Sequence, residues 1–323
     1  VFDLLFLTTV AAHFSNYFYS GLKKVWISDG SLTWWALNNQ TENLILTAYK
    51  SGHFPWPMPL ESIQFLYTFM SEWSWLTNLT LLIGQFIAIV AIMKSSWSRI
   101  VTAFYDLTHL GIFALTGIFF YKWIIYNFAI IWALSNIKNI RFTPLLRIYL
   151  ICVVAAAPLV FFVAKLGWFD NRSFNHEYFE AVYKNGDKLE IPSNYFLASS
   201  VTYAQQRIIK DKVNGHLPSS TFGVTFGMNN VRIGNRCGYK VDSSANLFTQ
   251  IGIENVHKIS KRIERSHQFY LQSEMGSGKA LNYDLYPHHI FSFPWNFDEF
   301  KNSKGPVFLE IIVKKGARKE LGR

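Results

Sequence analysis

Apolar runs of membrane-spanning length fill the first half of the chain, and charged residues gather in the second half. Residues 1–167 hold sixteen of the 52 Asp, Glu, Lys and Arg residues, and residues 168–323 hold the other thirty-six. A helix needs about 20 predominantly apolar residues to cross a bilayer. Only 16% of the whole chain is charged, whereas soluble domains usually carry about 25%. This division predicts a membrane-embedded N-terminal half and a water-soluble C-terminal half.

Five apolar segments are candidates for membrane helices. They are Val1–Leu22, Trp75–Met93, Ile100–Tyr121, Trp123–Leu134 and Pro144–Leu166, of which the fourth is short enough for a half-helix or one arm of a hairpin. We expect an interfacial loop over residues 27–59 with a short helix around Thr41–Tyr49, and a separate interfacial helix that starts at Ile63–Met70. Residues 1–166 therefore predict a polytopic α-helical membrane bundle. Because the chain begins inside an apolar run and not with Met, we expect further helices before Val1.

Residues 167–323 predict a soluble α+β domain that has more strand than helix. Apolar and polar residues alternate over residues 178–192 around Asn185-Gly186, and this dipeptide favours a hairpin because it tolerates a positive φ. Ala198–Lys212 has helical spacing, and Val307–Lys314 has the composition of a strand.

Basic residues flank the apolar runs and predict an orientation. They mark two connections, the first with Lys94 and Arg99, the second with Lys138, Arg141 and Arg147. Connections rich in Lys and Arg face the cytoplasm, so both should lie inside and the soluble domain outside. The net charge of +10 fits anionic lipid headgroups better than nucleic acid, because the positive charges of the polar half are mixed with acids. The expected partners are the bilayer and other membrane-protein subunits, with no nucleic acid.

The first apolar run carries a polar stripe. At 100° per residue, four polar side chains lie within about 40° of one direction: His13, Tyr17, Ser20 and Lys24. Asn16 lies just beyond them, and Lys23 points about 80° away. A polar stripe on a membrane helix must face protein, water or a ligand. Hydrogen bonding between helices, with lysines that reach the headgroups, is the simpler interpretation, and a binding site is the alternative.

A second polar pair lies in the predicted span 100–121. Asp106 and His109 are three residues apart and therefore share one helix face. An ionised carboxylate in mid-membrane costs at least ~2.5 kcal/mol, so Asp106 needs a partner, and Lys24 and His13 are available. The pair is either a structural ion pair or a proton-handling site. No metal site is expected, because neither the two cysteines nor His288-His289 have metal-ligand spacing.

The segment Asn16-Tyr-Phe-Tyr-Ser-Gly-Leu-Lys-Lys-Val-Trp26 resembles the Tyr-Phe-x-x-Gly-x-Lys-Lys-Leu segment of vitamin K-dependent γ-glutamyl carboxylases. The wider bacterial family with the horizontally transferred transmembrane (HTTM) domain shares that segment. The resemblance extends over about residues 1–165. It includes an aromatic, Pro-rich loop at 53–59, a Glu near the start of the next helix (Glu61 or Glu72), and the His109-containing segment Phe104-Tyr-Asp-Leu-Thr-His-Leu-Gly-Ile-Phe113.

This resemblance implies a bacterial inner-membrane protein in which Lys24 is the base that deprotonates a vitamin K-like quinol. His13, Asp106 and His109 would then tune the base, and Tyr17 and Ser20 would bind the quinol. An amine in a low-dielectric site loses affinity for its proton, which suits this role. We nevertheless favour a non-catalytic subunit of a larger membrane complex, because the family's functional Asn-His-containing stretch is not in this sequence. The alternatives are a quinone-linked γ-carboxylase-type enzyme and an immunity or transport-related membrane protein.

Overall fold

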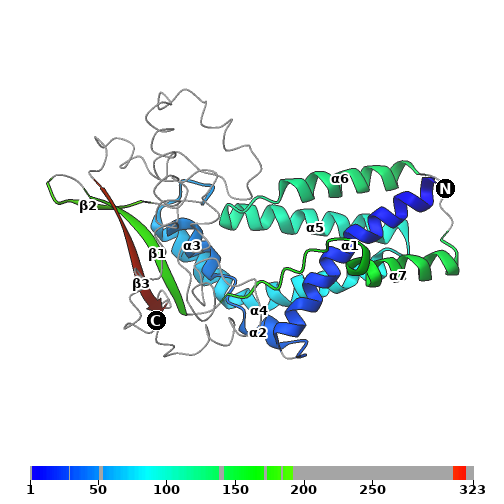
Figure 1. Cartoon of the computed structure of the whole chain (residues 1–323), viewed down its shortest axis with the longest axis horizontal. Helices are drawn as coiled ribbons and strands as arrows, with labels where there is room; N and C mark the ends of the chain where they lie inside the picture. The colour runs from blue at the N-terminus through cyan, green and yellow to red at the C-terminus, as the bar shows by residue number, and fades with distance from the viewer. Residues whose placement is uncertain are drawn as a thin grey trace, which may run out of the picture. The chain divides into compact units, whose positions relative to one another are not determined.

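The computed structural model describes residues 2–28, 30–50, 54–137, 142–170, 173–182, 185–191 and 308–317. The elements in chain order are α1 (Phe2–Ile27), α2 (Trp34–Asn38), α3 (Asn43–Lys50), α4 (Leu60–Ala91), α5 (Ser95–Thr116), α6 (Tyr121–Asn136), α7 (Pro144–Val160), β1 (Ser173–Val182), β2 (Lys188–Ile191) and β3 (Phe308–Ala317) (Figure 1). The chain divides into two compact units. Val1–Thr41, Glu72–Ile112 and Phe120–Phe169 form the first, here called the helical unit, and Glu42–Ser71, Phe113–Phe119 and Asp170–Arg323 form the second.

Helix α4 joins two segments that the sequence analysis kept apart. Ile63–Met70 and most of Trp75–Met93 belong to one continuous helix of 32 residues that ends at Ala91, so the prediction of two separate segments was wrong. The four residues between them contain neither Gly nor Pro, and the helix therefore continues. Among the described residues, α4 is the one helix that is both long and apolar enough to cross a membrane, and α7 is a shorter apolar helix.

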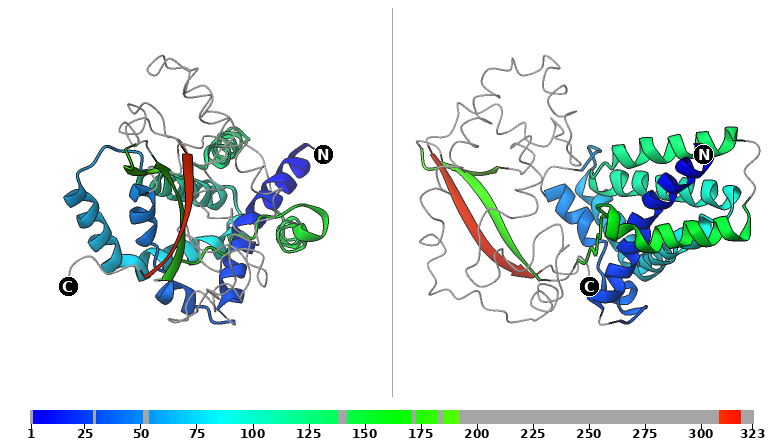
Figure 2. Two further views of the ribbon diagram at one scale, coloured as in Figure 1. Left: turned by 60° about the vertical axis from the view of Figure 1, so that its left-hand side comes forward. Right: turned by 45° about the vertical axis from the view of Figure 1, so that its right-hand side comes forward.

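Helices α5 and α6 form an antiparallel pair. Ser95 at the start of α5 contacts Leu134 near the end of α6, and Arg99 contacts Ser135; Figure 2 shows the two helices side by side. α5 ends at Thr116 and not at the predicted Tyr121, because Gly117 adopts a φ of 71°, a left-handed conformation that ends helices. The segment predicted as Trp123–Leu134 is longer at both ends, since α6 covers 16 residues.

The largest difference from prediction concerns the last apolar run, Pro144–Leu166. α7 ends at Val160, two residues after the internal Pro158, and residues 161–169 continue as an extended segment. We call residues 161–169 the strap. The predicted helix was therefore wrong beyond Val160. Inside the strap, the backbone N–H of Gly167 donates to the carbonyl oxygen of Lys165 at 3.0 Å. Polar groups of the strap without such a bond need other partners, and side chains of α1 bind several of them, as described below.

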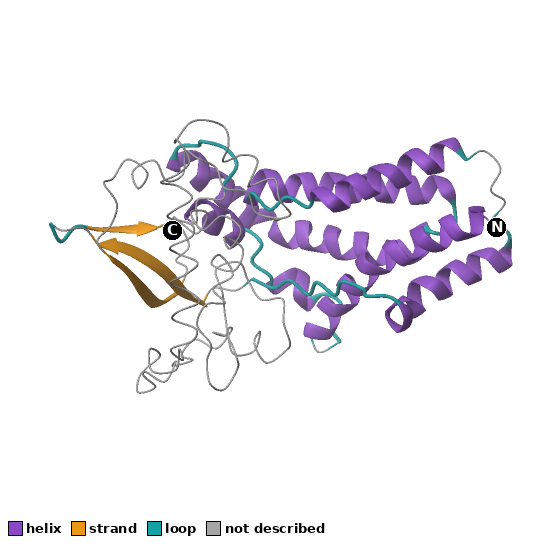
Figure 3. Ribbon diagram, turned by 45° about the horizontal axis from the view of Figure 1, so that its top comes forward, coloured by secondary structure: helices purple, strands orange, loops and turns teal. Residues whose placement is uncertain are grey.

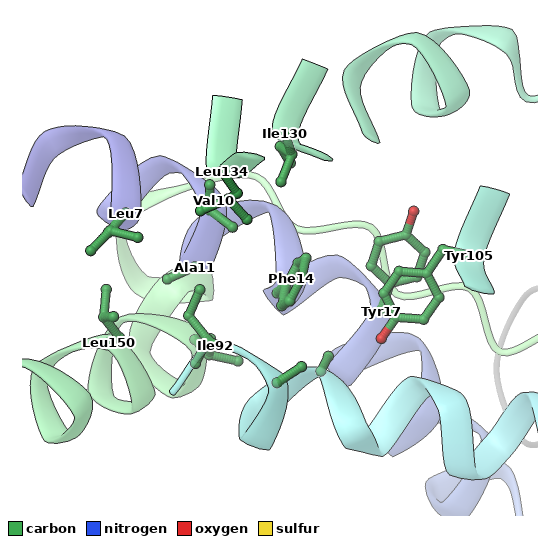
Figure 4. Close-up of a cluster of buried hydrophobic side chains, with 13 residues drawn as sticks. Leu7, Val10, Ala11, Phe14, Tyr17, Ile92, Tyr105, Ile130, Leu134 and Leu150 are labelled. Carbon is green, nitrogen blue, oxygen red and sulfur yellow. The ribbon is translucent and has the colours of Figure 1, made fainter. Parts of the chain in front are cut away.

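The core of the helical unit surrounds α1. Four apolar side chains of α1, of different sizes, lie at helical spacing and are almost completely buried: Leu7, Val10, Ala11 and Phe14. Side chains from α4, α5, α6 and α7 pack against them, and Figure 4 shows Ile92, Tyr105, Ile130 and Leu150 in this cluster. Because α1 lies at the centre of this core, its polar stripe also faces other parts of the protein.

Two helical glycines test the packing of this unit. A Cβ atom added to Gly84 in α4 would lie 2.3 Å from Cε1 of Phe104, whereas one added to Gly111 in α5 would meet nothing within 4 Å. We expect Gly84→Ala to lower the free energy of unfolding by about 1–3 kcal/mol through overpacking. Gly111→Ala should raise it by about 0.5–1 kcal/mol, because Ala favours the helix. Thermal unfolding followed by tryptophan fluorescence would measure both, and equal midpoints would contradict the packing.

The second unit contains a short helix, a small apolar cluster and an antiparallel sheet. α3 confirms the predicted short helix, and Ile45, Ala48, Phe54 and Ile63 form the cluster. The sheet has strand order β2-β1-β3, and Figure 3 draws its strands in orange. Strands β1 and β2 confirm the predicted hairpin, in which Gly186 has a φ of 90°, and β3 confirms the predicted strand at Val307–Lys314. The predicted helix Ala198–Lys212 lies outside the described residues.

Candidate functional site

The polar stripe of α1 belongs to two separate clusters. Its first part, with His13 and Tyr17, faces α5 and α6, and its second part, with Ser20 and Lys24, faces α4 and the strap. Lys24 lies eleven residues beyond His13, which corresponds to roughly 16 Å along a helix. The polar stripe predicted one site for these residues, and the structure does not bring them together.

Lys24 is buried and bound by uncharged groups. Only 4% of the residue is exposed. Its Nζ donates hydrogen bonds to Oε1 of Gln85 and to the carbonyl oxygen of Leu166, both at 3.0 Å, and lies 4.9 Å from the centre of the Trp35 ring. Two oxygen acceptors and an aromatic face all stabilise an ammonium ion. Among the described residues, no carboxylate lies within ion-pair distance of Lys24.

Gln85 reaches Lys24 because α4 and α1 approach closely at Gly21. A Cβ atom added to Gly21 would lie 3.1 Å from Cβ of Gln85. A larger residue at this position would therefore push the two helices apart and withdraw the amide from the amine. Gly21 in the Gly-Leu-Lys-Lys sequence thus has a structural reason to be glycine.

The strap lies along the polar face of α1 and is bound through its backbone. The backbone N–H of Ala164 donates to Oδ1 of Asn16 at 2.8 Å, and that of Leu166 donates to Oγ of Ser20 at 3.2 Å. Four residues of helix rise about 6 Å, and two extended residues span about 6.6 Å. Asn16 and Ser20 therefore match Ala164 and Leu166, and Lys24 binds the carbonyl oxygen of the same Leu166.

Two further contacts fix the end of the strap. Nε1 of Trp35 donates to the carbonyl oxygen of Trp168 at 2.6 Å, and the ring of Trp34 stacks on Phe169. A Cβ atom added to Gly167 would lie 2.4 Å from Cδ1 of Ile27. Only glycine allows the strap to pass this close to α1.

Asn127 of α6 organises the other cluster. This residue is fully buried. Its Oδ1 accepts a hydrogen bond from Nε2 of His13 at 2.7 Å, and its Nδ2 donates to Oδ1 of Asp106 at 2.8 Å and to the hydroxyl of Tyr17 at 3.0 Å. A single amide therefore connects α1, α5 and α6. Asp106 has Asn127 as its partner, and the predicted pairing with Lys24 or His13 was wrong.

His109 lies beside this cluster among aromatic rings. Its ring centre is 5.2 Å from that of Phe120, 6.0 Å from Tyr17 and 6.3 Å from Trp123. Its Nδ1 is buried and has no hydrogen-bond partner among the described residues. Asp106 and His109 share one face of α5, as predicted, and the face is turned towards α6. Within the part of the chain that the structure describes, no three His, Cys, Asp or Glu residues are arranged to hold a metal ion.

Three important residues were missed by the sequence analysis. Gln85 and Asn127 are the amides that bind Lys24 and His13, and Trp35 covers Lys24. Gln85 had a usable signal, because a polar residue in the membrane-length apolar run Trp75–Met93 needs a partner; Asn127 had a weaker one, in the shorter run Trp123–Leu134. Trp35 had none, since its position depends on the strap.

Comparison of the chain with models of known families, with curated proteins and with solved structures finds no match.

Proposed function

We propose that the helical unit is a polytopic bundle in a bacterial inner membrane and that the residues after the strap lie outside the cytoplasm. Besides α4, an outward apolar stripe on α6 supports a membrane location. Ile125, Phe128 and Trp132 follow helical spacing, and between 64% and 66% of each is exposed. Soluble helices bury such a stripe and expose their polar face. The basic residues Lys94 and Arg99 place the α4–α5 connection inside.

Within that membrane, we propose that the chain is a non-catalytic subunit of a larger assembly. The observation that carries this proposal is the way Lys24 is bound. Its two hydrogen bonds join α1 to α4 and to the strap, so the amine serves as a donor that connects three segments of the fold. In this role Lys24 and Ser20 stabilise the fold, and the exposed faces of α6 and α7 contact lipid and partner chains.

Extraction from the native membrane tests the subunit role. We expect a mild detergent to release the protein together with other chains in a fixed stoichiometry, because its exposed apolar faces exceed what a soluble monomer tolerates. Native mass spectrometry of this extract would measure the mass of the complex. A free monomer at low detergent concentration would contradict the proposal.

The buried cluster around Asn127 favours a second candidate, a quinone-linked enzyme of the γ-carboxylase type. His13, Tyr17, Asp106 and His109 gather polar, titratable groups among the aromatic rings of Trp123 and Tyr105. Buried titratable groups cluster at functional sites more often than elsewhere. This candidate uses the HTTM-like segment 16–26 as the family does, with Lys24 as the base. It requires Lys24 to act on a ligand and not on the strap, which is the point on which the two candidates differ.

A further inference from the structure

We propose that the strap is a releasable cover over the Lys24 amine. Between Ala164 and Trp168 the strap is bound to the rest of the helical unit through its backbone. The bound groups are the N–H groups of Ala164 and Leu166 and the carbonyl oxygens of Leu166 and Trp168. The carbonyl oxygen of Ala164 also lies 3.4 Å from Oγ of Ser20. Backbone contacts of this kind are independent of side-chain identity.

Buried side chains attach the strap at its two ends, and between them Lys165 lies with its Nζ 5.8 Å from the centre of the Tyr19 ring. Val163 and Phe169 are buried at its two ends, but Lys165 and Leu166 between them are exposed, and 97% of Phe162 is exposed. Segments with few buried apolar contacts open at a lower free energy than packed helices do. The section 164–168 can therefore leave α1 while α7 and the core around Phe14 stay folded.

Release of this section would change the environment of Lys24. The amine would lose the carbonyl oxygen of Leu166, one of its two hydrogen-bond acceptors, and the covering backbone would no longer exclude reagents. Gln85 would remain as its partner. A closed strap thus keeps the amine bound and inaccessible, and an open strap presents it to a reactant or an extended peptide. This inference goes beyond the subunit role, because it holds whichever chains surround the bundle.

Site-resolved amine labelling of the full chain in lipid nanodiscs tests the cover. Reductive methylation would be followed by tandem mass spectrometry that separates Lys23 from Lys24. Lys23 is partly exposed and gives the comparison within the wild-type protein. Lys94 is exposed beside Trp97 and serves as the reference for the variants. We expect Lys24 to react at least about tenfold more slowly than Lys23 in the wild-type protein, since it reacts only when the strap opens.

Two variants should open the strap by different routes. Ser20→Ala removes the acceptor for the N–H of Leu166, and we expect it to raise the labelling rate of Lys24 about tenfold. Gly167→Ala forces the strap away from Ile27 and should raise the rate as well. Ser15→Ala is the matched control for Ser20→Ala. Ser15 is also a buried serine of α1 that donates to its own helix, and it does not contact the strap.

The outcomes are distinct. A Lys24 rate that rises with Ser20→Ala and Gly167→Ala in folded protein, at a constant rate of the exposed Lys94, supports the cover. Equal rates at Lys23 and Lys24 in the wild-type protein would overturn it. So would a Ser20→Ala rate no higher than that of Ser15→Ala. These results do not depend on partner chains, so failure here is distinguishable from failure of the subunit proposal.

Discussion

Replacing Lys24 by Met should lower the free energy of unfolding of the helical unit by about 2–4 kcal/mol, because each buried polar group left without a partner costs about 1–3 kcal/mol. Met fills a similar volume but cannot donate a hydrogen bond. Oε1 of Gln85 and the carbonyl oxygen of Leu166 would both lose their donor in a partly buried place. Thermal unfolding in detergent, followed by tryptophan fluorescence, measures the change.

The adjacent lysine provides the control. Lys23→Met removes the same charge one residue earlier, but Lys23 is partly exposed and its Nζ lies over the Trp26 ring at 3.7 Å. We expect the unfolding midpoint of Lys23→Met to stay close to that of the wild-type protein. If both variants unfolded at the same temperature, Lys24 would not anchor the strap.

Replacing Asn127 by Leu should have the largest effect on stability, about 3–5 kcal/mol, because the loss of this buried amide leaves several polar groups without their partner at about 1–3 kcal/mol each. The amide is completely buried and contacts His13, Tyr17 and Asp106. Asn136→Leu is the control on the same helix, since Asn136 is exposed and bonds only to the Trp132 carbonyl in its own helix. Chemical or thermal unfolding of the two variants gives the comparison.

A second substitution shows whether the loss of stability comes from the hydrogen bond between Asn127 and Asp106 or from general damage to the core. If the cost arises from the unpaired carboxylate, then Asp106→Leu combined with Asn127→Leu should be less destabilising than the sum of the two single changes. Strictly additive losses would mean that the hydrogen bond between Asn127 and Asp106 contributes nothing to stability.

The sequence predicted the helical half well and its ends poorly. Apolar runs identify α1, α5 and α6 because burial against other helices and exposure to lipid both require apolar residues. Helix ends depend on single positions, as Gly117 shows for α5. The strap could not be predicted, because residues 161–166 are as apolar as a helix and become extended only where Asn16 and Ser20 bind their backbone.

The helical spacing of the stripe was correct, and its single-site interpretation was not. Periodicity shows that His13 and Lys24 point in similar directions from α1. It does not show that different helices pack against α1 at these two positions. Asn127 meets the stripe at His13, and Gln85 meets it at Lys24. Knowledge of which helices pack together is needed for that distinction, and a single sequence does not contain it.

The most direct test of the account is the oxidation of a reduced vitamin K-type quinol by the full chain in lipid nanodiscs, compared per folded protein with Lys24→Met. If Lys24 anchors the strap in a non-catalytic subunit, the two proteins should give the same rate as protein-free nanodiscs. Turnover by the wild-type protein that disappears in folded Lys24→Met would contradict the anchoring role and establish Lys24 as the base.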